Sequence, residues 1–164
     1  MEILDIINEK DEVIGTATRE ECHNNPNIMH RVVHFTLYDK DLGKILLTKR
    51  SLKKRPDPGK IIFLGEHVLS GETYEDALLR GVKEELGFLP KYFKELGIKI
   101  FKQEEQKEYA KFFIIFFDGE EIMADRCEIE SEWWLDIKEL KNFNDNLSSI
   151  TQYWIDSIDW NKAL

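Results

Sequence analysis

The chain has 164 residues, of which 42% are hydrophobic and 12% aromatic, and this apolar content suits one compact domain, 1–164, with a single core. Its formal charge of −9 argues against nucleic acid as a partner, because binding the phosphate backbone requires a basic face. With only Cys22 and Cys127, no signal-peptide pattern and no apolar run long enough to span a membrane, we expect a cytoplasmic protein with no membrane partner.

The first elements in chain order are short strands. Strand-forming residues on either side of a polar turn predict strands at Ile3–Ile7 and Val13–Thr18, which pair as an N-terminal β-ribbon over about 1–18. A short helix or loop, 19–27, follows this ribbon. Strands at 31–38 and 44–48 then flank another turn and are expected to form a hairpin of the central sheet.

The one dense basic run lies in residues 49–55. A guanidinium group binds phosphate oxygens through two hydrogen bonds and an ammonium adds a point charge, so this run suits an anionic substrate in an acidic chain. A solvated basic loop is an equally good interpretation of the run alone. Pro56 and Gly59 then break regular structure before a strand predicted at 61–64.

A helix is predicted next, beginning after Thr73 and ending at Gly87. Thr73 followed by Asp76 is typical of a capping pair, and glycine is typical of a helix end. Apolar residues recur at helical spacing and are expected to be buried: Leu78, Leu79, Val82 and Leu86. At about 100° per residue, the other side holds Ala77, Arg80, Gly81, Glu84 and Glu85.

Glu84 and Glu85 come together with the loop before this helix, where a backbone carbonyl such as that of Gly65 completes a site for a hard divalent cation. Mg²⁺ and Mn²⁺ prefer carboxylate, carbonyl and water oxygens, commonly with a substrate phosphate as a further ligand. A pair of glutamates alone is more often a solvated acidic face. The capped helix, its arginine and the glycine-containing loop together favour the metal site.

The stretch from Gly65 to Phe88 resembles the Nudix box, the signature of the Nudix hydrolases. The residues in register with the box are Glu72, Arg80, Val82, Glu84, Glu85, Gly87 and Phe88. Two residues depart from it: Glu66 stands where the box has its first glycine, and Gly81 where it has the glutamate after the arginine. In many Nudix hydrolases that glutamate binds metal or acts as the general base, so the resemblance implies slower turnover here. Glu66 either adds an oxygen ligand beside Gly65 or points away.

The residues before the box resemble the Nudix branch that includes the isopentenyl-diphosphate isomerases. The segments NEKDEVIGTATREECH, MHRVVHFTLYD and LLTKRSL carry this likeness, which with the box covers most of 5–87. In the isomerases, histidines spaced like His23, His30 and His67 bind a divalent metal together with later glutamates. A lone histidine is more often structural. Against an isomerase, the catalytic cysteine of that family's loop is replaced by Gly65.

The resemblance implies further site residues. Arg50 and Lys54 fall where the isomerases contact the substrate diphosphate, and His67 is in register with their loop histidine. Nudix hydrolases often bring one more glutamate from the region after the box to the metal or to the attacking water. Glu108 is our candidate for that role, because it directly precedes a core strand, whereas Glu104 and Glu105 are as well explained by an acidic loop.

Strands are predicted after the helix at 97–102, 109–117 and 132–135, and the second of these is nearly all apolar and expected at the centre of the sheet. A short helix at 136–141 and a last helix over about 147–160 follow. The last helix is expected to bury Leu147, Ile150, Trp154 and Ile158. The resemblance implies the α/β/α Nudix sandwich, with a mixed β-sheet between helices.

Three functions are open at this point. The first is Mg²⁺- or Mn²⁺-dependent hydrolysis of a diphosphate bond in a small nucleoside diphosphate-linked substrate. Its catalytic residues are Glu84, Glu85, Arg80 and Glu108, and its metal ligands are Gly65, Glu84, Glu85, Glu108 and His67. The second is an isopentenyl-diphosphate isomerase-like reaction, and the third is a non-catalytic nucleotide-binding module. A homodimer is among the oligomeric states left open.

Overall fold

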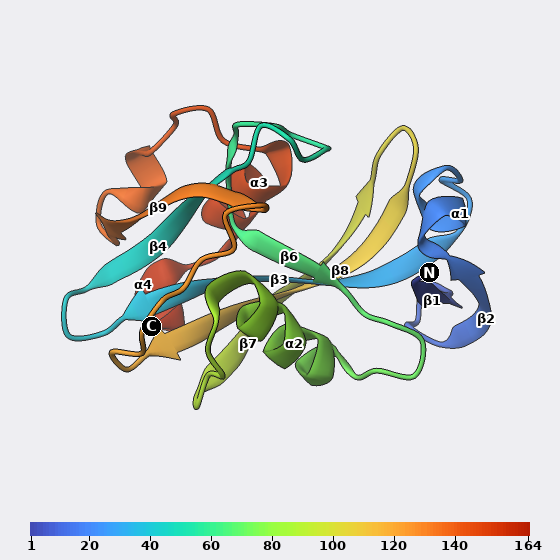
Figure 1. Ribbon diagram of the computed structural model, residues 1–164, viewed down its shortest axis with the longest axis horizontal. Helices are drawn as coiled ribbons and strands as arrows, with labels where there is room; N and C mark the ends of the chain where they lie inside the picture. The colour runs from blue at the N-terminus through green and yellow to red at the C-terminus, as the bar shows by residue number, and fades with distance from the viewer.

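The computed structural model describes residues 1–164 and contains one sheet of nine strands with four α-helices (Figure 1). The strands are β1 (Ile3–Ile7), β2 (Val13–Thr18), β3 (Met29–Asp39), β4 (Lys44–Arg50), β5 (Ile61–Ile62), β6 (Leu64–His67), β7 (Phe93–Lys102), β8 (Lys107–Phe117) and β9 (Ile129–Asp136). The helices are α1 (Arg19–His23), α2 (Tyr74–Leu86), α3 (Ser149–Ser157) and α4 (Trp160–Ala163), with one 3-10 turn, η1 (Leu140–Asn142). None of the helices is both long enough and apolar enough to cross a membrane.

Strand β3 lies at the centre of the sheet. It pairs in parallel with β8 along its whole length, and β1, β6 and β4 pair with it antiparallel at successive positions. Strand β8 lies between β3 and β7, which confirms the central position expected for its apolar run. The sheet is therefore mixed. Strand β6 has β3 as its one strand partner, so its other edge is free.

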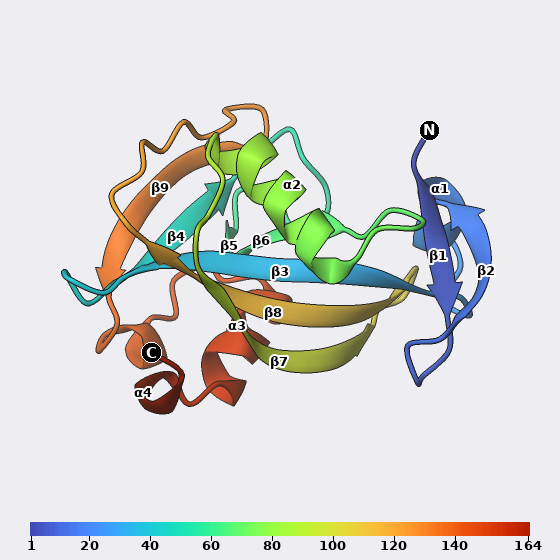
Figure 2. The same ribbon diagram turned by 90° about the horizontal axis from the view of Figure 1, so that it is seen from below.

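The two faces of the sheet bury separate apolar clusters. Val33 and Phe35 of β3 pack with α2 on one face. Val32 of β3 packs on the other face with Trp154 and Ile155 of α3. Because side chains alternate along a strand, each helical layer takes every second residue of β3. Figure 2 shows α2 on one side of the sheet and α3 with α4 on the other, so the predicted α/β/α sandwich with a mixed sheet is confirmed.

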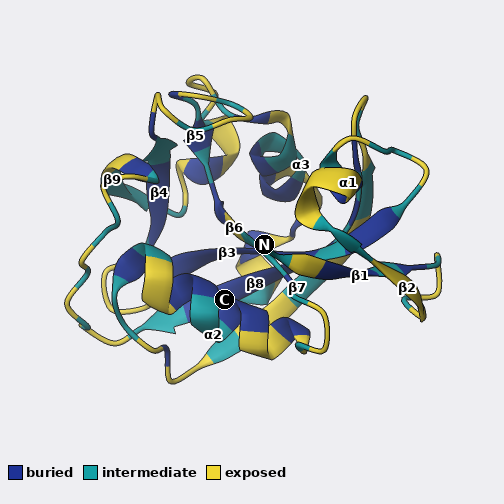
Figure 3. Ribbon diagram, turned by 45° about the vertical axis from the view of Figure 1, so that its right-hand side comes forward, coloured by how far each residue is buried: buried dark blue, intermediate teal, exposed yellow.

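Helix α2 begins and ends where the sequence predicts, but its buried face is different. The buried residues are Tyr74, Ala77, Leu78, Gly81, Val82 and Leu86. The prediction was wrong for Ala77 and Gly81, which we expected on the open side, and for Leu79, which is only partly buried. Small residues at 77 and 81 let the helix backbone approach the sheet, so the buried arc rotates toward them. Figure 3 shows buried and exposed stripes alternating along α2.

Other element bounds differ because of contacts between distant parts of the chain. The strand expected at 61–64 is divided into β5 and β6 at Phe63, whose backbone N–H donates to the Thr151 hydroxyl at 2.9 Å. The helix expected at 136–141 is replaced by the turn η1. The last helix is shorter than expected and interrupted, because α3 begins after the Ser148 cap and the chain leaves helical geometry at Ile158.

Candidate metal and phosphate site

A cleft of about 530 Å³ runs past the free edge of β6. Its walls come from α1, β3, β6, the C-terminal end of α2, the loop after β4 and the beginning of α3. The lining includes the predicted site residues Arg50, Lys54, Gly65, His67, Glu84, Glu85 and Glu108. Arg80 is the one predicted site residue that does not line the cleft. Arg50 and Glu108, which are 58 positions apart in the sequence, line the same cavity.

The helix that carries the glutamates is fixed at both ends. The Thr73 hydroxyl accepts from the Asp76 N–H at 3.1 Å, and the Asp76 carboxylate accepts from the Thr73 N–H at 3.1 Å. At the other end Gly87 adopts φ +83°, a left-handed conformation that glycine takes without strain. These caps set where Arg80, Glu84 and Glu85 stand relative to β6.

Arg80 ties the loop before α2 to the helix. Its guanidinium donates to both oxygens of Glu72 at 2.9 Å and to the His67 carbonyl at 2.7 Å. It also lies 3.3 Å from Glu66 Oε1 and 3.7 Å from Glu84 Oε2. Hydrogen bonds from Arg80 lower the pKa of Glu72. Arg80 therefore contacts the carboxylates of Glu66, Glu72 and Glu84 and can orient all three.

The His67 carbonyl also reveals the direction of the neighbouring Gly65 carbonyl. The His67 carbonyl points away from β3, because it accepts from Arg80. Carbonyls of residues two apart in a strand face the same edge, so the carbonyl of Gly65 faces the free edge of β6 and the cleft. This orientation is the one required of the backbone ligand predicted at Gly65.

Glu85 is the most perturbed carboxylate of α2. Burial raises its pKa to about 8, with further contributions from the nearby charges of Glu128, Glu66 and Asp125, while Arg50 acts in the opposite direction. Its Oε2 is buried and has no hydrogen-bond partner. A buried carboxylate oxygen without a partner, among like charges, is a donor atom that a divalent cation satisfies. The residues therefore fit a hard divalent cation at the end of α2.

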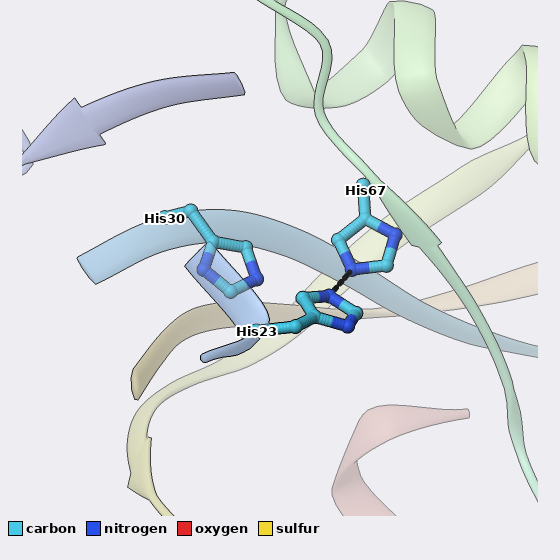
Figure 4. A group of neighbouring side chains, drawn as sticks. All are labelled: His23, His30 and His67. Carbon is cyan, nitrogen blue, oxygen red and sulfur yellow. Dashed lines mark hydrogen bonds between the residues drawn. The ribbon is translucent and has the colours of Figure 1, made fainter. Parts of the chain in front are cut away.

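A second group of candidate metal ligands consists of three histidines (Figure 4). Ligand atoms of His23, His30 and His67 all lie within 4.8 Å of one another, and the Nε2 atoms of His23 and His67 are 2.8 Å apart. Both ring nitrogens of His30 are buried without a partner. Burial lowers the pKa of His30 to about 4 and that of His67 well below its ordinary value. Neutral imidazoles at pH 7 are the form that binds a metal.

Glu108 joins this histidine group. It stands opposite His30 in the β3–β8 register, and its Oε1 lies 4.0 Å from His30 Nε2. Burial raises the pKa of Glu108 to about 7, and its Oε2 has no hydrogen-bond partner. The structure thus puts Glu108 with the histidines, whereas Glu66, Glu84 and Glu85 form no group of three as tight as theirs.

The basic residues Arg50 and Lys54 line the same cleft. Arg50 donates to the Arg55 carbonyl at 3.2 Å, and its Nε is buried without a partner. Lys54 forms an ion pair with Glu128 and remains partly exposed. Two basic side chains and several carboxylates in one cleft are the residue types that bind a phosphate and a divalent cation.

Sequence reasoning missed residues that line the cleft. His34 lies opposite Gly65 in the β3–β6 register and accepts a hydrogen bond at its Nδ1 from Trp154 Nε1 at 3.0 Å. Trp154 was predicted only as a core residue. Asp125 and Glu128 come from an irregular segment before β9, and the only signal for them in the sequence is their acidity.

Comparison with known proteins places the chain in a family. The model of the NUDIX domain matches residues 29–154. An uncharacterized Nudix hydrolase of Nostoc sp. is 45% identical over 87 residues, which cover 52% of this chain and 51% of that protein. An isopentenyl-diphosphate Delta-isomerase of Mycolicibacterium vanbaalenii is 34% identical over 89 residues, covering 52% and 48%. The chain spans about half the length of the curated relatives it matches.

Solved structures show the same fold. DR0079 from Deinococcus radiodurans is similar with a TM-score of 0.79 and 24% identity, over 96% of this chain and 99% of that one. The NUDIX domain of NrtR from Shewanella oneidensis, solved with ADP ribose, is similar with a TM-score of 0.63 and 15% identity, over 77% and 83%. Because the family model matches well over half of the residues and the fold agrees, the chain belongs to the NUDIX domain family.

Proposed function

We propose that the protein is a Mg²⁺- or Mn²⁺-dependent hydrolase that cleaves a diphosphate bond in a small nucleoside diphosphate-linked substrate. The observation that carries this proposal is that Glu84 and Glu85 of α2 line the same cleft as Arg50 and Lys54, with Glu84 lying 3.7 Å from Arg80. The ADP ribose bound by the NrtR domain is a compound of the proposed class and gives further support.

In this proposal, one set of residues binds the metal and another set binds the phosphates. Glu84, Glu85 and the Gly65 carbonyl would hold the cation, which would polarise a phosphoryl oxygen and lower the pKa of a water. Arg50 and Lys54 bind the phosphate oxygens and orient the chain of phosphates. In the reaction a water oxygen bonds to phosphorus, the bridging P–O bond breaks, and the leaving group departs with its phosphate. The proton of the water would pass to a carboxylate, and Glu108 is our candidate because it lines the same cleft from the α3 face of the sheet and burial raises its pKa.

The test is a screen of the purified chain with Mg²⁺ or Mn²⁺ against nucleoside diphosphates and triphosphates, nucleotide sugars and dinucleotides, followed by phosphorus NMR. We expect cleavage that depends on the metal and is lost in Glu84→Gln and Glu85→Gln. Glu75→Gln, an exposed residue in the first turn of α2, is the matched control and should retain activity. Cleavage that survives Glu84→Gln and Glu85→Gln contradicts the proposal.

A second candidate is an isopentenyl-diphosphate isomerase-like reaction, which the grouping of His23, His30 and His67 beside Glu108 favours. Packing at Gly65 opposes it, because a Cβ at that position would lie 2.9 Å from His34 Cδ2. A cysteine there requires His34 to move, and the hydrogen bond from Trp154 holds His34 in place. Formation of dimethylallyl diphosphate from isopentenyl diphosphate without phosphate release would establish the isomerase. Thermal stabilisation by nucleotides without turnover would instead favour a binding module.

A further inference from the structure

The two departures from the Nudix box lie against each other in space. Glu66 on β6 pairs with Val33 of β3, so its side chain points to the α2 face of the sheet. A Cβ added at Gly81 would lie 3.0 Å from Glu66 Cβ, 3.3 Å from Glu66 Cγ and 3.3 Å from Phe35. The space that a side chain at position 81 would take is therefore filled by the stem of Glu66.

The Glu66 carboxylate is held beside the glutamates of α2. Its Oε1 accepts from the His67 N–H at 2.9 Å and lies 3.3 Å from Arg80 Nη1. Both contacts use Oε1, which leaves Oε2 for a ligand in the cleft that Glu66 lines. Burial raises the pKa of Glu66, with a smaller contribution from the charge of Glu84, and the charge of Glu66 in turn contributes to the raised pKa of Glu85.

We propose that Glu66 supplies from strand β6 the carboxylate that Gly81 lacks on α2, as an oxygen ligand of the divalent cation. Relative to the Nudix box, the glutamate stands on β6 at position 66 and the glycine on α2 at position 81, where the two elements touch. Glu66 fits because residue 81 has no side chain, and Gly81 is suitable because Glu66 supplies the carboxylate. This inference rests on the proposed metal-dependent function. It also predicts that Gly81→Glu alone fails to improve the site, because the new Cβ would press against the stem of Glu66, 3.0 Å away.

Mn²⁺ binding tests the exchange without using activity. The purified full chain is titrated with Mn²⁺ and the free ion is measured by electron paramagnetic resonance, with thermal unfolding recorded for every variant. Glu66→Gln keeps the shape of the side chain and should weaken Mn²⁺ binding at least tenfold. Glu84→Gln serves as the reference for loss of a ligand on α2. Glu75→Gln should bind as the unchanged protein does.

The exchanged variant completes the test. Gly81→Glu should lower the melting temperature, whereas Glu66→Gly combined with Gly81→Glu should restore folding and bring Mn²⁺ affinity back to within about threefold of the original. If Glu84→Gln weakens binding and Glu66→Gln does not, Glu66 is no ligand and only this inference fails. If neither variant weakens binding, the carboxylate site of the proposed function fails as well. If the double variant melts normally but binds Mn²⁺ weakly, the proposal that the two positions are interchangeable is also wrong. If the double variant does not fold, the effect of Glu66→Gln on Mn²⁺ binding decides whether Glu66 is a ligand.

Discussion

Replacing Arg80 by lysine tests whether this arginine holds the site together. Arg80 donates two hydrogen bonds to Glu72 and one to the His67 carbonyl, and its side chain is 23% exposed. Lysine keeps the charge but cannot make the paired contact, so about two of these bonds are lost. Hydrogen bonds to charged groups contribute about 1.5–3 kcal/mol each when buried. After allowance for partial exposure, we expect Arg80→Lys to lower the free energy of unfolding by about 2 kcal/mol.

The chain offers a matched control for this prediction. Arg126 also donates two hydrogen bonds to one carboxylate, that of Glu132, at 2.5 and 2.8 Å, but its side chain is 60% exposed. Arg126→Lys should therefore cost less than about 1 kcal/mol. Urea unfolding followed by circular dichroism measures both, and the Arg80 variant should also melt about 4–8 °C lower. Equal losses in the two variants would refute the argument that the loop-to-helix connection depends on Arg80.

Three further predictions concern stability. Hydrogen bonds from Arg80 lower the pKa of Glu72, so the stability that the Glu72 carboxylate contributes is complete above the ordinary pKa of glutamate and is lost as the pH falls. The difference in unfolding free energy between the unchanged protein and Glu72→Gln should therefore shrink from pH 7 to below about pH 4 in urea titrations. A difference that stays constant with pH contradicts this prediction. Trp154→Phe removes the donor to His34 Nδ1 and should cost about 1–2 kcal/mol by urea unfolding, so a neutral effect would show that this bond is dispensable. Leu78→Ala empties a fully buried position and should cost about 3 kcal/mol, against about 0.5 kcal/mol or less for the exposed Leu89→Ala.

The sequence predicts elements well where their causes are local. The bounds of β1 and β2 agree with the prediction, because a turn and a run of strand-forming residues define them. The ends of α2 agree for the same reason, since Thr73 with Asp76 and Gly87 act within one helical turn. The interruption between β5 and β6 at Phe63 depends on a hydrogen bond to Thr151, which is 88 positions away, so no local sequence pattern predicts it.

The candidate site shows the same division between local and distant causes. The spacing of Arg80, Glu84 and Glu85 fixes their places on a helix, and these places follow from the sequence. The burial of Glu85 depends on which arc of α2 meets the sheet, and two small residues at Ala77 and Gly81 decide that. Asp125 contributes to the raised pKa of Glu85 from a segment without regular structure, which spacing cannot locate.

The alternation of side chains along β6 separates the two chemistries considered for this cleft. Gly65 and His67 pair with His34 and Val32, so they face α3, whereas Glu66 faces α2. The histidine group and Glu108 therefore lie on the α3 face, and the carboxylates of α2 lie on the other, with the free edge of β6 between them. A shift of one residue in this strand would exchange the two sets. We therefore expect variants on one face to alter one candidate metal centre and to leave the other candidate centre intact, and a substrate whose reaction needs both centres must bind across the edge of β6.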